Sequence, residues 1–482
     1  MDAITEAVTN INDYYWYFVI AILCIAGVWF TVWTKAVQIR LIPEMFRSIT
    51  ESPSEIEEGK QGISAFRAFT VSAASRVGSA NVAGVAVAIT LGGPGAVFWM
   101  WLLAILGGAT SFVESSLGQL YKVRKRDSYV GGPAYYIRDA LGWKWVAVLF
   151  AVIITVTYGF VFNAVQANSI AQSLNNQFDI EGTGPMVIIG IVLALLTASV
   201  IFGGIRRLSA VTEIMVPIMA FAYVAVALVV VVLNISEVPN VFWLIVGHAL
   251  GIKEVAGAAI GTAIMQGIRR GLFSNEAGMG SVPNAAATAS VSHPVKQGLV
   301  QSLGVYFDTL LVCSATAFII LLSDPSYGGD PEGISLTQDA LAAQVGEWAI
   351  PFLTIVIFFL AFSSILGNSY YGESNINFLR ESKLALTIFR VLVCVAVVGG
   401  AIGSIDLVWS LADLFMAFMA TINLIALIPL AKIAMKLMKN YTDQKKQGLD
   451  PVFSRDDIPE AKNVSEWDGS DPLTVRQPAE HS

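Results

Sequence analysis

Long runs of apolar residues, interrupted by short polar segments, extend along the chain from residue 14 to residue 431. A bilayer core about 30 Å thick is crossed by a helix of about 20 mostly apolar residues. The runs predict eleven membrane-spanning helices, at residues 14–34, 63–91, 95–120, 144–172, 184–204, 209–234, 252–285, 295–322, 338–372, 384–403 and 406–431. Since these runs do not alternate with polar residues, they exclude the strands of a membrane β-barrel. The predicted fold class is an all-α polytopic membrane protein.

The positive charges of the connecting segments fall almost entirely on one set of those segments. Lys and Arg follow the odd-numbered spans, whereas the N-terminal segment and the segments after even-numbered spans contain only Lys253. Segments rich in Lys and Arg stay on the cytoplasmic side of a membrane. We therefore expect a multi-pass protein of the cell membrane with its N-terminus outside and its C-terminus in the cytoplasm.

Two sequence patterns recur at nearly equal distances along the chain. Residues 76–84 and 270–278 both fit R-x4-N-x-A-G, at a shift of 194 residues. Phe, Asn, Ser, Asn and Phe at positions 162, 168, 169, 175 and 178 recur at a shift of 200 residues. The alternative is a coincidence between glycine-rich helices.

The two shifts link span 2 to span 7 and span 4 to span 9, so a repeat would contain five spans. Because five is odd, consecutive repeats must cross the membrane in opposite directions. The predicted architecture is an inverted 5+5 repeat, which secondary transporters use to bind solute near the membrane midplane. The predicted units are 1–62 with an extra helix, repeats at 63–234 and 252–438, and a disordered cytoplasmic tail at 439–482.

Each recurring motif contains residues that weaken a continuous helix. Gly78 and Gly84 lie among serines and Asn81 in span 2, and Gly271, Gly278 and Pro283 lie in span 7. Amides freed at a helix break can hold a carboxylate, and freed carbonyls can hold Na⁺. Close helix packing is the alternative for these glycines, since Gly267 and Gly271 have the spacing of a small-residue packing motif.

Composition narrows the functional classes further. The chain is 55% hydrophobic and 13% charged, with a net charge of −7, against roughly 25% charged residues in soluble domains. These values exclude a soluble enzyme and a nucleic-acid binder. The three Cys and three His are scattered, and no G-x-S-x-G, H-E-x-x-H or nucleotide-binding P-loop occurs. We expect neither an enzyme nor an ATP-driven pump.

One segment resembles the signature of a known family. Residues 92–107, GGPGAVFWMWLLAILG, are similar to the signature of the alanine or glycine:cation symporters, also called the sodium:alanine symporter family. The blocks SRVGSANVAGVAVAI and GLFSNEAGMGSVPNAAATA resemble further family segments. The resemblance implies a LeuT-like fold and Na⁺- or H⁺-driven uptake of small neutral amino acids. Ala80 departs from the family pattern, which often has Gly-x-Gly-Asn here.

The resemblance and the polar residues within the spans give a candidate substrate site. Amides of Gly78 and Ser79 would bind the substrate carboxylate, as the resemblance implies. Asn81 is a further ligand, or it caps its own helix break. Gln166 is the best side-chain ligand in span 4, with an interhelical hydrogen bond as the alternative. In span 7 the candidates for the ammonium group and the side chain are Phe273, Ser274 and Asn275.

A candidate Na⁺ site combines two spans. The resemblance implies that the carbonyls of Ala74 and Val77 are ligands, completed by hydroxyls of Ser363 and Ser364 in span 9. Na⁺ binds hard oxygen ligands, which both groups supply. The alternative for the two serines is a hydrogen bond to the preceding turn of their own helix. No cofactor is expected besides Na⁺ as the coupling ion.

The leading hypothesis is a secondary symporter that carries Na⁺ and alanine or glycine inward. A proton-coupled carrier of another small neutral solute is the first alternative, with Glu276 or Asp308 as proton carriers. A channel and an intramembrane enzyme are weaker alternatives. The expected partners are the amino acid, Na⁺ and membrane lipid, without nucleic acid or an obligate protein. Two buried pairs are candidate gates: Arg270 with Glu276, and Arg76 with an acid on a neighbouring span. Charge balance and fold specificity are the alternative for both.

Overall fold

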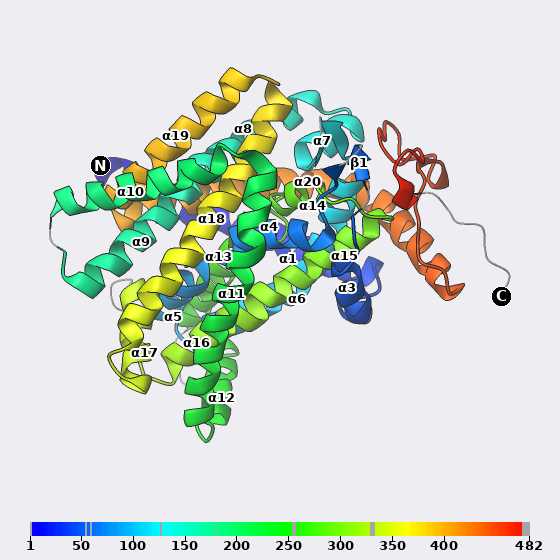
Figure 1. Ribbon diagram of the computed structural model, residues 1–482. Helices are drawn as coiled ribbons and strands as arrows, with labels where there is room; N and C mark the ends of the chain where they lie inside the picture. Colours follow the sequence, from blue (N-terminus) through cyan, green and yellow to red (C-terminus); the bar gives the residue numbers. More distant parts are fainter. Residues whose placement is uncertain are drawn as a thin grey trace.

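The computed structural model describes residues 2–53, 55–57, 60–125, 128–180, 182–252, 257–327 and 333–474. Its helices form one bundle (Figure 1) and are α1 (Asp2–Trp33), α2 (Val37–Arg40), α3 (Ile42–Ile49), α4 (Ala65–Arg76), α5 (Val85–Gly92), α6 (Gly95–Leu120), α7 (Pro133–Asp139), α8 (Lys144–Val156), α9 (Phe162–Phe178), α10 (Thr183–Ile201), α11 (Gly204–Leu233), α12 (Val238–Ala249), α13 (Gly257–Asn275), α14 (Val282–Ala286), α15 (Pro294–Val305), α16 (Ser314–Leu321), α17 (Ile334–Val345), α18 (Ala349–Leu379), α19 (Lys383–Ile402) and α20 (Ile405–Lys446). Two short antiparallel hairpins, β1 (Glu55–Glu57) with β2 (Lys60–Gln61) and β3 (Val123–Lys125) with β4 (Ser128–Val130), connect helices.

Most of the predicted spans are present as long apolar helices. Within the described residues, nine helices are long and apolar enough to cross a membrane, and the bent pair α4–α5 makes a tenth. The predicted seventh span, 252–285, contains α13 and the short α14. The predicted ninth span begins too early, because α17 is a separate helix. Gly346, at φ 97°, ends α17, and α18 then begins at Ala349.

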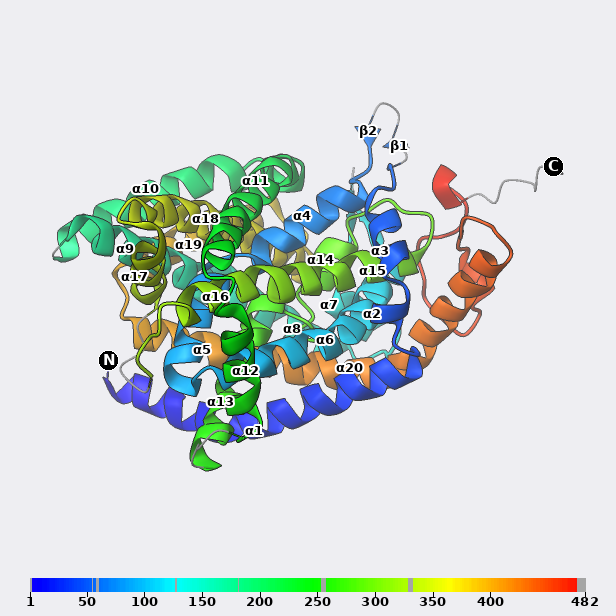
Figure 2. The same ribbon diagram turned by 90° about the horizontal axis from the view of Figure 1, so that it is seen from below.

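The extra helix α1 lies along the outside of the bundle, beside α20 (Figure 2). Trp16 is fully buried in this contact, and Arg269 of α13 stacks over its ring at 5.3 Å. At the same end of the helix, Asn12 donates to the carbonyl of Ser410 at 2.9 Å. These contacts attach α1 to α13 and α20.

Both predicted helix breaks are present. The first separates α4 from a π-helical turn, Ala80–Gly84, that leads into α5, and the two arms are bent by 52°. The second follows Asn275, where Glu276, Gly278 and Gly280 have φ angles of 58°, 92° and 78°. Glycine tolerates this left-handed conformation without a steric cost, so the glycines of the motif permit the interruption.

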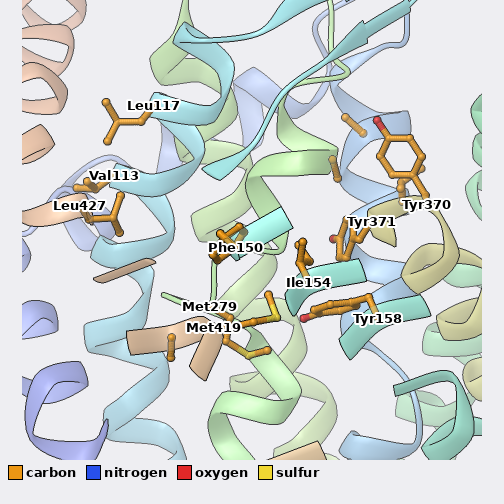
Figure 3. Close-up of a cluster of buried hydrophobic side chains, with 14 of the residues drawn as sticks. Val113, Leu117, Phe150, Ile154, Tyr158, Met279, Tyr370, Tyr371, Met419 and Leu427 are labelled. Carbon is orange, nitrogen blue, oxygen red and sulfur yellow. The ribbon is translucent and has the colours of Figure 1, made fainter. Parts of the chain in front are cut away.

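A buried cluster of aromatic and aliphatic side chains packs the helices around the breaks (Figure 3). Tyr158 lies within a π-helical turn, Thr157–Val161, and packs its ring edge-on against Tyr371 of α18 at 5.1 Å between centroids. Met279 of the second break lies beside Met419 of α20 in the same cluster. The broken segments are therefore fixed by apolar packing from three neighbouring helices.

The C-terminal segment differs from the expectation of a disordered tail. Beyond α20, residues 447–474 fold against one end of the bundle, which we call the tail face (Figure 1). Phe453 and Trp467 are buried, and the Lys122 ammonium lies 4.4 Å from the Trp467 ring. Asp471 accepts a hydrogen bond from Ser290 at 3.1 Å. The polar composition suggested disorder, but these two aromatic residues supply enough apolar contact to anchor the segment.

Candidate functional site

The first break exposes two backbone amides inside the bundle. The Gly78 amide donates to Asn81 Oδ1 at 2.9 Å, so Asn81 caps its own break. The Ser79 amide donates to Gln166 Oε1 of α9 at 3.0 Å. Gln166 is 3% exposed and the others are buried as well. The structure therefore brings four of the predicted substrate residues together, and the Gln166 oxygen occupies a position that an anionic oxygen would also favour.

Asn81 also connects the first break to two other helices. Its Nδ2 donates to Ser274 Oγ of α13 at 3.2 Å and to Asp308 Oδ1 at 2.7 Å. Asp308 lies in a π-helical turn, Tyr306–Cys313, between α15 and α16. Its second oxygen accepts from Thr309 at 2.9 Å and from Ser274. A buried carboxylate thus lies within reach of both broken helices, with Cys313 Sγ 3.0 Å from Ser274 Oγ.

The amides of the second break are already occupied by protein groups. Asn275 Oδ1 accepts from the amide of Ala277 at 3.0 Å and so caps its own helix. Glu114 of α6 accepts from the amides of Gly278 and Gly280 at 3.1 and 3.2 Å. Asn423 of α20 donates to the same carboxylate at 2.8 Å. The buried Glu114 therefore fixes the second break.

Glu276 lies in the second break, and it does not pair with Arg270 as expected. Its two carboxylate oxygens accept from Ser75 and Ser281, each at 2.7 Å. Arg270 instead forms a salt bridge with Asp413 of α20, and both side chains are less than a tenth exposed. The predicted Arg270–Glu276 gate is wrong, because α13 ends before Glu276, whose φ angle is 58°, and the Glu276 carboxylate bonds to Ser75 of α4 instead.

Aromatic side chains form a packed layer at the candidate site. The Phe273 ring packs edge-on against Phe162 at 4.7 Å and against Trp409 at 5.3 Å. The Arg270 guanidinium lies 5.0 Å from the Trp409 ring, so the salt bridge continues the same layer. Phe162 and Trp409 were not among the predicted site residues, since aromatic residues within a membrane span give no signal of their own.

The residues of the candidate Na⁺ site are only partly brought together. Ser364 Oγ donates to the Ala74 carbonyl at 2.8 Å and to that of Leu360 at 3.1 Å. Ser363 Oγ donates to the Leu360 carbonyl at 2.7 Å, within its own helix. An oxygen of span 9 and a carbonyl of the first break thus lie side by side. Val77 ends α4 at the same break.

These features define a class of protein. Two interrupted helices lie against each other inside a bundle of membrane-spanning helices, and polar groups converge between them, away from lipid. Irregular backbone is tolerated at this depth only inside protein or beside a cavity. The arrangement is that of a secondary transporter with an inverted repeat.

The chain belongs to the sodium:alanine symporter family, whose model matches residues 1–455. It is 50% identical to the amino-acid carrier protein AlsT of Bacillus subtilis over 97% of this chain and 99% of that protein. It is 46% identical to the probable sodium/glutamine symporter GlnT of the same organism, over 98% of each chain. It is 36% identical to the sodium/proton-dependent alanine carrier protein of Bacillus sp. strain PS3, over 88% of this chain and 97% of that protein.

The fold is also similar to a solved structure. The crystal structure of MhsT in complex with L-phenylalanine superposes with a TM-score of 0.54 at 13% identity, over 83% of this chain and 95% of that chain. This likeness confirms the predicted LeuT-like fold of inverted five-helix repeats.

Proposed function

We propose that this chain is a Na⁺-coupled symporter that carries a small neutral amino acid, alanine or glycine, into the cell. The contact between the Ser79 amide and Gln166 Oε1 supports this proposal most directly. The Gln166 oxygen marks the position that a carboxylate oxygen of the substrate takes on binding, and the displaced side chain then donates from its Nε2 to the same carboxylate. The names of the relatives AlsT and the strain PS3 carrier support an amino acid, and alanine in particular, as the substrate class.

Both ends of a zwitterion need partners in this position. An unpaired ionic group inside a protein costs several kcal/mol even after relaxation. The amides of Gly78 and Ser79 receive the carboxylate, and carbonyls between Phe273 and Asn275 receive the ammonium. The Phe273 ring, held between Phe162 and Trp409, then limits the side chain to a methyl group or a hydrogen.

Two substitutions test the placement of the substrate. Gln166→Ala is expected to raise the alanine concentration for half-maximal uptake about tenfold, the equivalent of about 1.4 kcal/mol. Phe273→Ala is expected to admit larger neutral amino acids, because it enlarges the space for the side chain. Uptake of an amino-acid panel by proteoliposomes, with and without a Na⁺ gradient, measures both effects.

The matched control is Gln172→Ala, since Gln172 lies on the same helix but contacts Asn168. Its alanine response should equal that of the wild type. An unchanged alanine response in Gln166→Ala would contradict the proposed site. So would strong competition from simple alkylamines, which lack the carboxylate.

We further propose that Na⁺ binds between Ala74, Val77, Ser363 and Ser364. Replacing both serines with Ala is expected to weaken the Na⁺ dependence of uptake at unchanged protein abundance, because a dry site would lose two oxygen ligands. Alanine uptake measured across a series of Na⁺ concentrations gives the change. A Na⁺ response like that of the wild type would move the ion elsewhere. It would favour the second candidate, a proton-coupled carrier, for which the buried acids Glu276 and Asp308 each link the two broken helices.

The orientation in the membrane is part of the proposal. Of the Lys and Arg that lie in connecting segments outside the tail, nearly all follow odd-numbered spans. This distribution supports a cytoplasmic tail face and an N-terminus outside. The layer of Phe273, Trp409 and the Arg270–Asp413 pair then closes the site toward the outside. Surrounding lipid is the remaining partner, and the transport mechanism requires no chemical catalysis.

A further inference from the structure

Two asparagines of α18 belong to the pattern that recurs along the chain, and the candidate site uses neither of them. Asn368 and Asn375 are seven residues apart, so they lie on the same face of the helix. Each is 1% exposed. Amides inside a membrane span are costly unless they are hydrogen-bonded, and there they mark positions with a role. The partners of these two side chains therefore indicate what this face of α18 does.

Asn368 connects α18 to the end of α4. The Ser75 Oγ atom lies 2.7 Å from the Asn368 side-chain oxygen and 2.7 Å from a Glu276 carboxylate oxygen. A hydroxyl has one hydrogen, which the carboxylate takes as the stronger acceptor. Within the described residues, Asn368 Nδ2 has no hydrogen-bond partner. Turning the amide by 180° satisfies both groups, because Nδ2 then donates to Ser75. A chain of two hydrogen bonds thus runs from α18 through α4 to Glu276 in the second break.

Asn375 connects α18 to α14, which follows the second break. Its Nδ2 donates to Asn284 Oδ1 at 3.0 Å. The Asn284 amide in turn donates to the carbonyls of Gly280 and Ser281 at 3.1 and 2.7 Å. The same face of α18 therefore holds segments of both broken spans.

The backbones of α18 and α4 also approach closely at this level. A Cβ atom at Gly367 would lie 2.7 Å from the amide nitrogen of Ser75 and 3.1 Å from its Cα. Such a contact leaves no space for a solute between the two helices.

This contact lies between the candidate site and the tail face. The segments α4 and α14 lead from the two breaks toward that face. Ile63, just before α4, pairs in a parallel β-bridge with Ala289, shortly after α14. The next residue, Ser290, bonds to Asp471 of the ordered tail. A solute that leaves the site toward the tail face therefore passes along α4 and α14, which α18 closes on one side.

We propose that Asn368 and Asn375 form an inner gate, which holds α4 and α14 against α18 and so closes the site toward the cytoplasm. The inference rests on the proposed function and orientation. The hydrogen bonds of the inner gate exist only while these segments are together, so they favour the closed arrangement. A conformation that is open toward the tail face has to break them. Both asparagines are thus positioning residues, which determine access to the site without contact with the solute.

The access of a thiol reagent to Cys313 tests the inner gate in the full-length chain. Cys313 Sγ lies 3.0 Å from Ser274 Oγ in the candidate site, and the residue is 3% exposed. Replacing Cys24 and Cys394 with Ala leaves Cys313 as the only cysteine of the chain. A membrane-impermeant methanethiosulfonate is then added to inside-out vesicles, which present the cytoplasmic side, and to right-side-out vesicles.

The variant Asn368→Ala/Asn375→Ala is expected to raise the rate of Cys313 labelling from the cytoplasmic side about tenfold, because each buried hydrogen bond shifts an equilibrium several-fold. Labelling from the outside should not increase. The matched control is Asn168→Ala, at the repeat counterpart of Asn368. Asn168 is 3% exposed and donates to the carbonyls of Gly400 and Gly403 at the end of α19, at 3.0 and 2.8 Å. Its labelling should equal that of the wild type.

Three results would overturn the inner gate: an unchanged rate in the double variant, an equal rise in Asn168→Ala, or an equal rise from both sides of the membrane. Thermal unfolding in detergent compares the stability of the variants, and the two single variants replace the double variant if it does not fold. Alanine uptake by the wild type tests the proposed function separately. The labelling effect without alanine uptake would overturn that function and support the gate, whereas uptake without the labelling effect would overturn the gate alone.

Discussion

Gly78→Ala is expected to abolish alanine uptake while the protein still reaches the membrane. A Cβ atom at this position would lie 2.1 Å from Ser364 Oγ and 2.9 Å from Gln166 Oε1. No side chain tolerates the first distance, so the Ser364 hydroxyl must turn away from the Ala74 carbonyl or the two helices must separate. That movement disrupts the candidate carboxylate and Na⁺ sites together. We expect a loss of at least about 100-fold in uptake, corresponding to roughly 2.8 kcal/mol of binding.

Gly84→Ala is the matched control in the same interrupted helix. Its Cβ would meet only Trp409, Ala80 and Arg270, at 3.7–4.0 Å, which is ordinary contact. This variant should therefore keep most of its uptake. Proteoliposome uptake, normalised to membrane abundance, measures both variants. Equal activity of the two variants would show that Gly78 is not in close contact with the substrate site.

Asp413→Asn is expected to cause the second large effect, mainly on stability. The side chains of Arg270 and Asp413 are 4% and 8% exposed. Removing one partner of a buried salt bridge leaves an unpaired charge and costs about 3–5 kcal/mol. We expect low abundance and a lowered unfolding temperature in detergent. Arg270→Met should behave in the same way, since it leaves the carboxylate of Asp413 unpaired.

Arg270→Met/Asp413→Leu separates stability from closure of the site. Replacing both charges with apolar groups should restore abundance, because no buried charge remains unpaired. Uptake should stay impaired, since Trp409 loses the guanidinium that lies over its ring. The exposed pair Lys439–Asp443 on α20 is the control, and its neutralisation should change neither property. If Asp413→Asn and Arg270→Met were as stable as the wild type, the remaining charge would have to be hydrated, and the argument from a buried salt bridge would fail.

The helices were predictable because each is a continuous apolar run, and the breaks because glycine and polar residues interrupt two of those runs. Gly346 was missed as a boundary, since apolar residues continue on both sides of it and only its φ angle of 97° reveals the turn. The ordered tail was missed for the opposite reason. A few aromatic residues anchor a polar segment only where the bundle offers them a surface.

Within the candidate site, the residues that could be predicted from the sequence are those that belong to one motif. Gly78, Ser79 and Asn81 lie within four residues of each other, so their proximity follows from the chain itself. Partners of buried charges were not predictable in this way. Asn81 and Asp308 are 227 residues apart, and Glu114 and Asn423 are 309 residues apart. Any of several acids would satisfy the same charge balance, and only the packing of the helices selects one.

The contact of Glu114 with the second break has a consequence for the orientation of the substrate along the membrane normal. An inverted repeat places two equivalent amide ends on opposite sides of one solute, so a zwitterion could bind head-first or tail-first. Glu114 fills the amide end at Gly278 and Gly280 with a resident anion. With this end filled and the substrate placed as proposed, only one of the two orientations remains. Every solute then crosses with its carboxylate toward the same half of the molecule. Removing Glu114 from α6 and placing an acid on α9, beside the first break, would reverse the orientation of the solute.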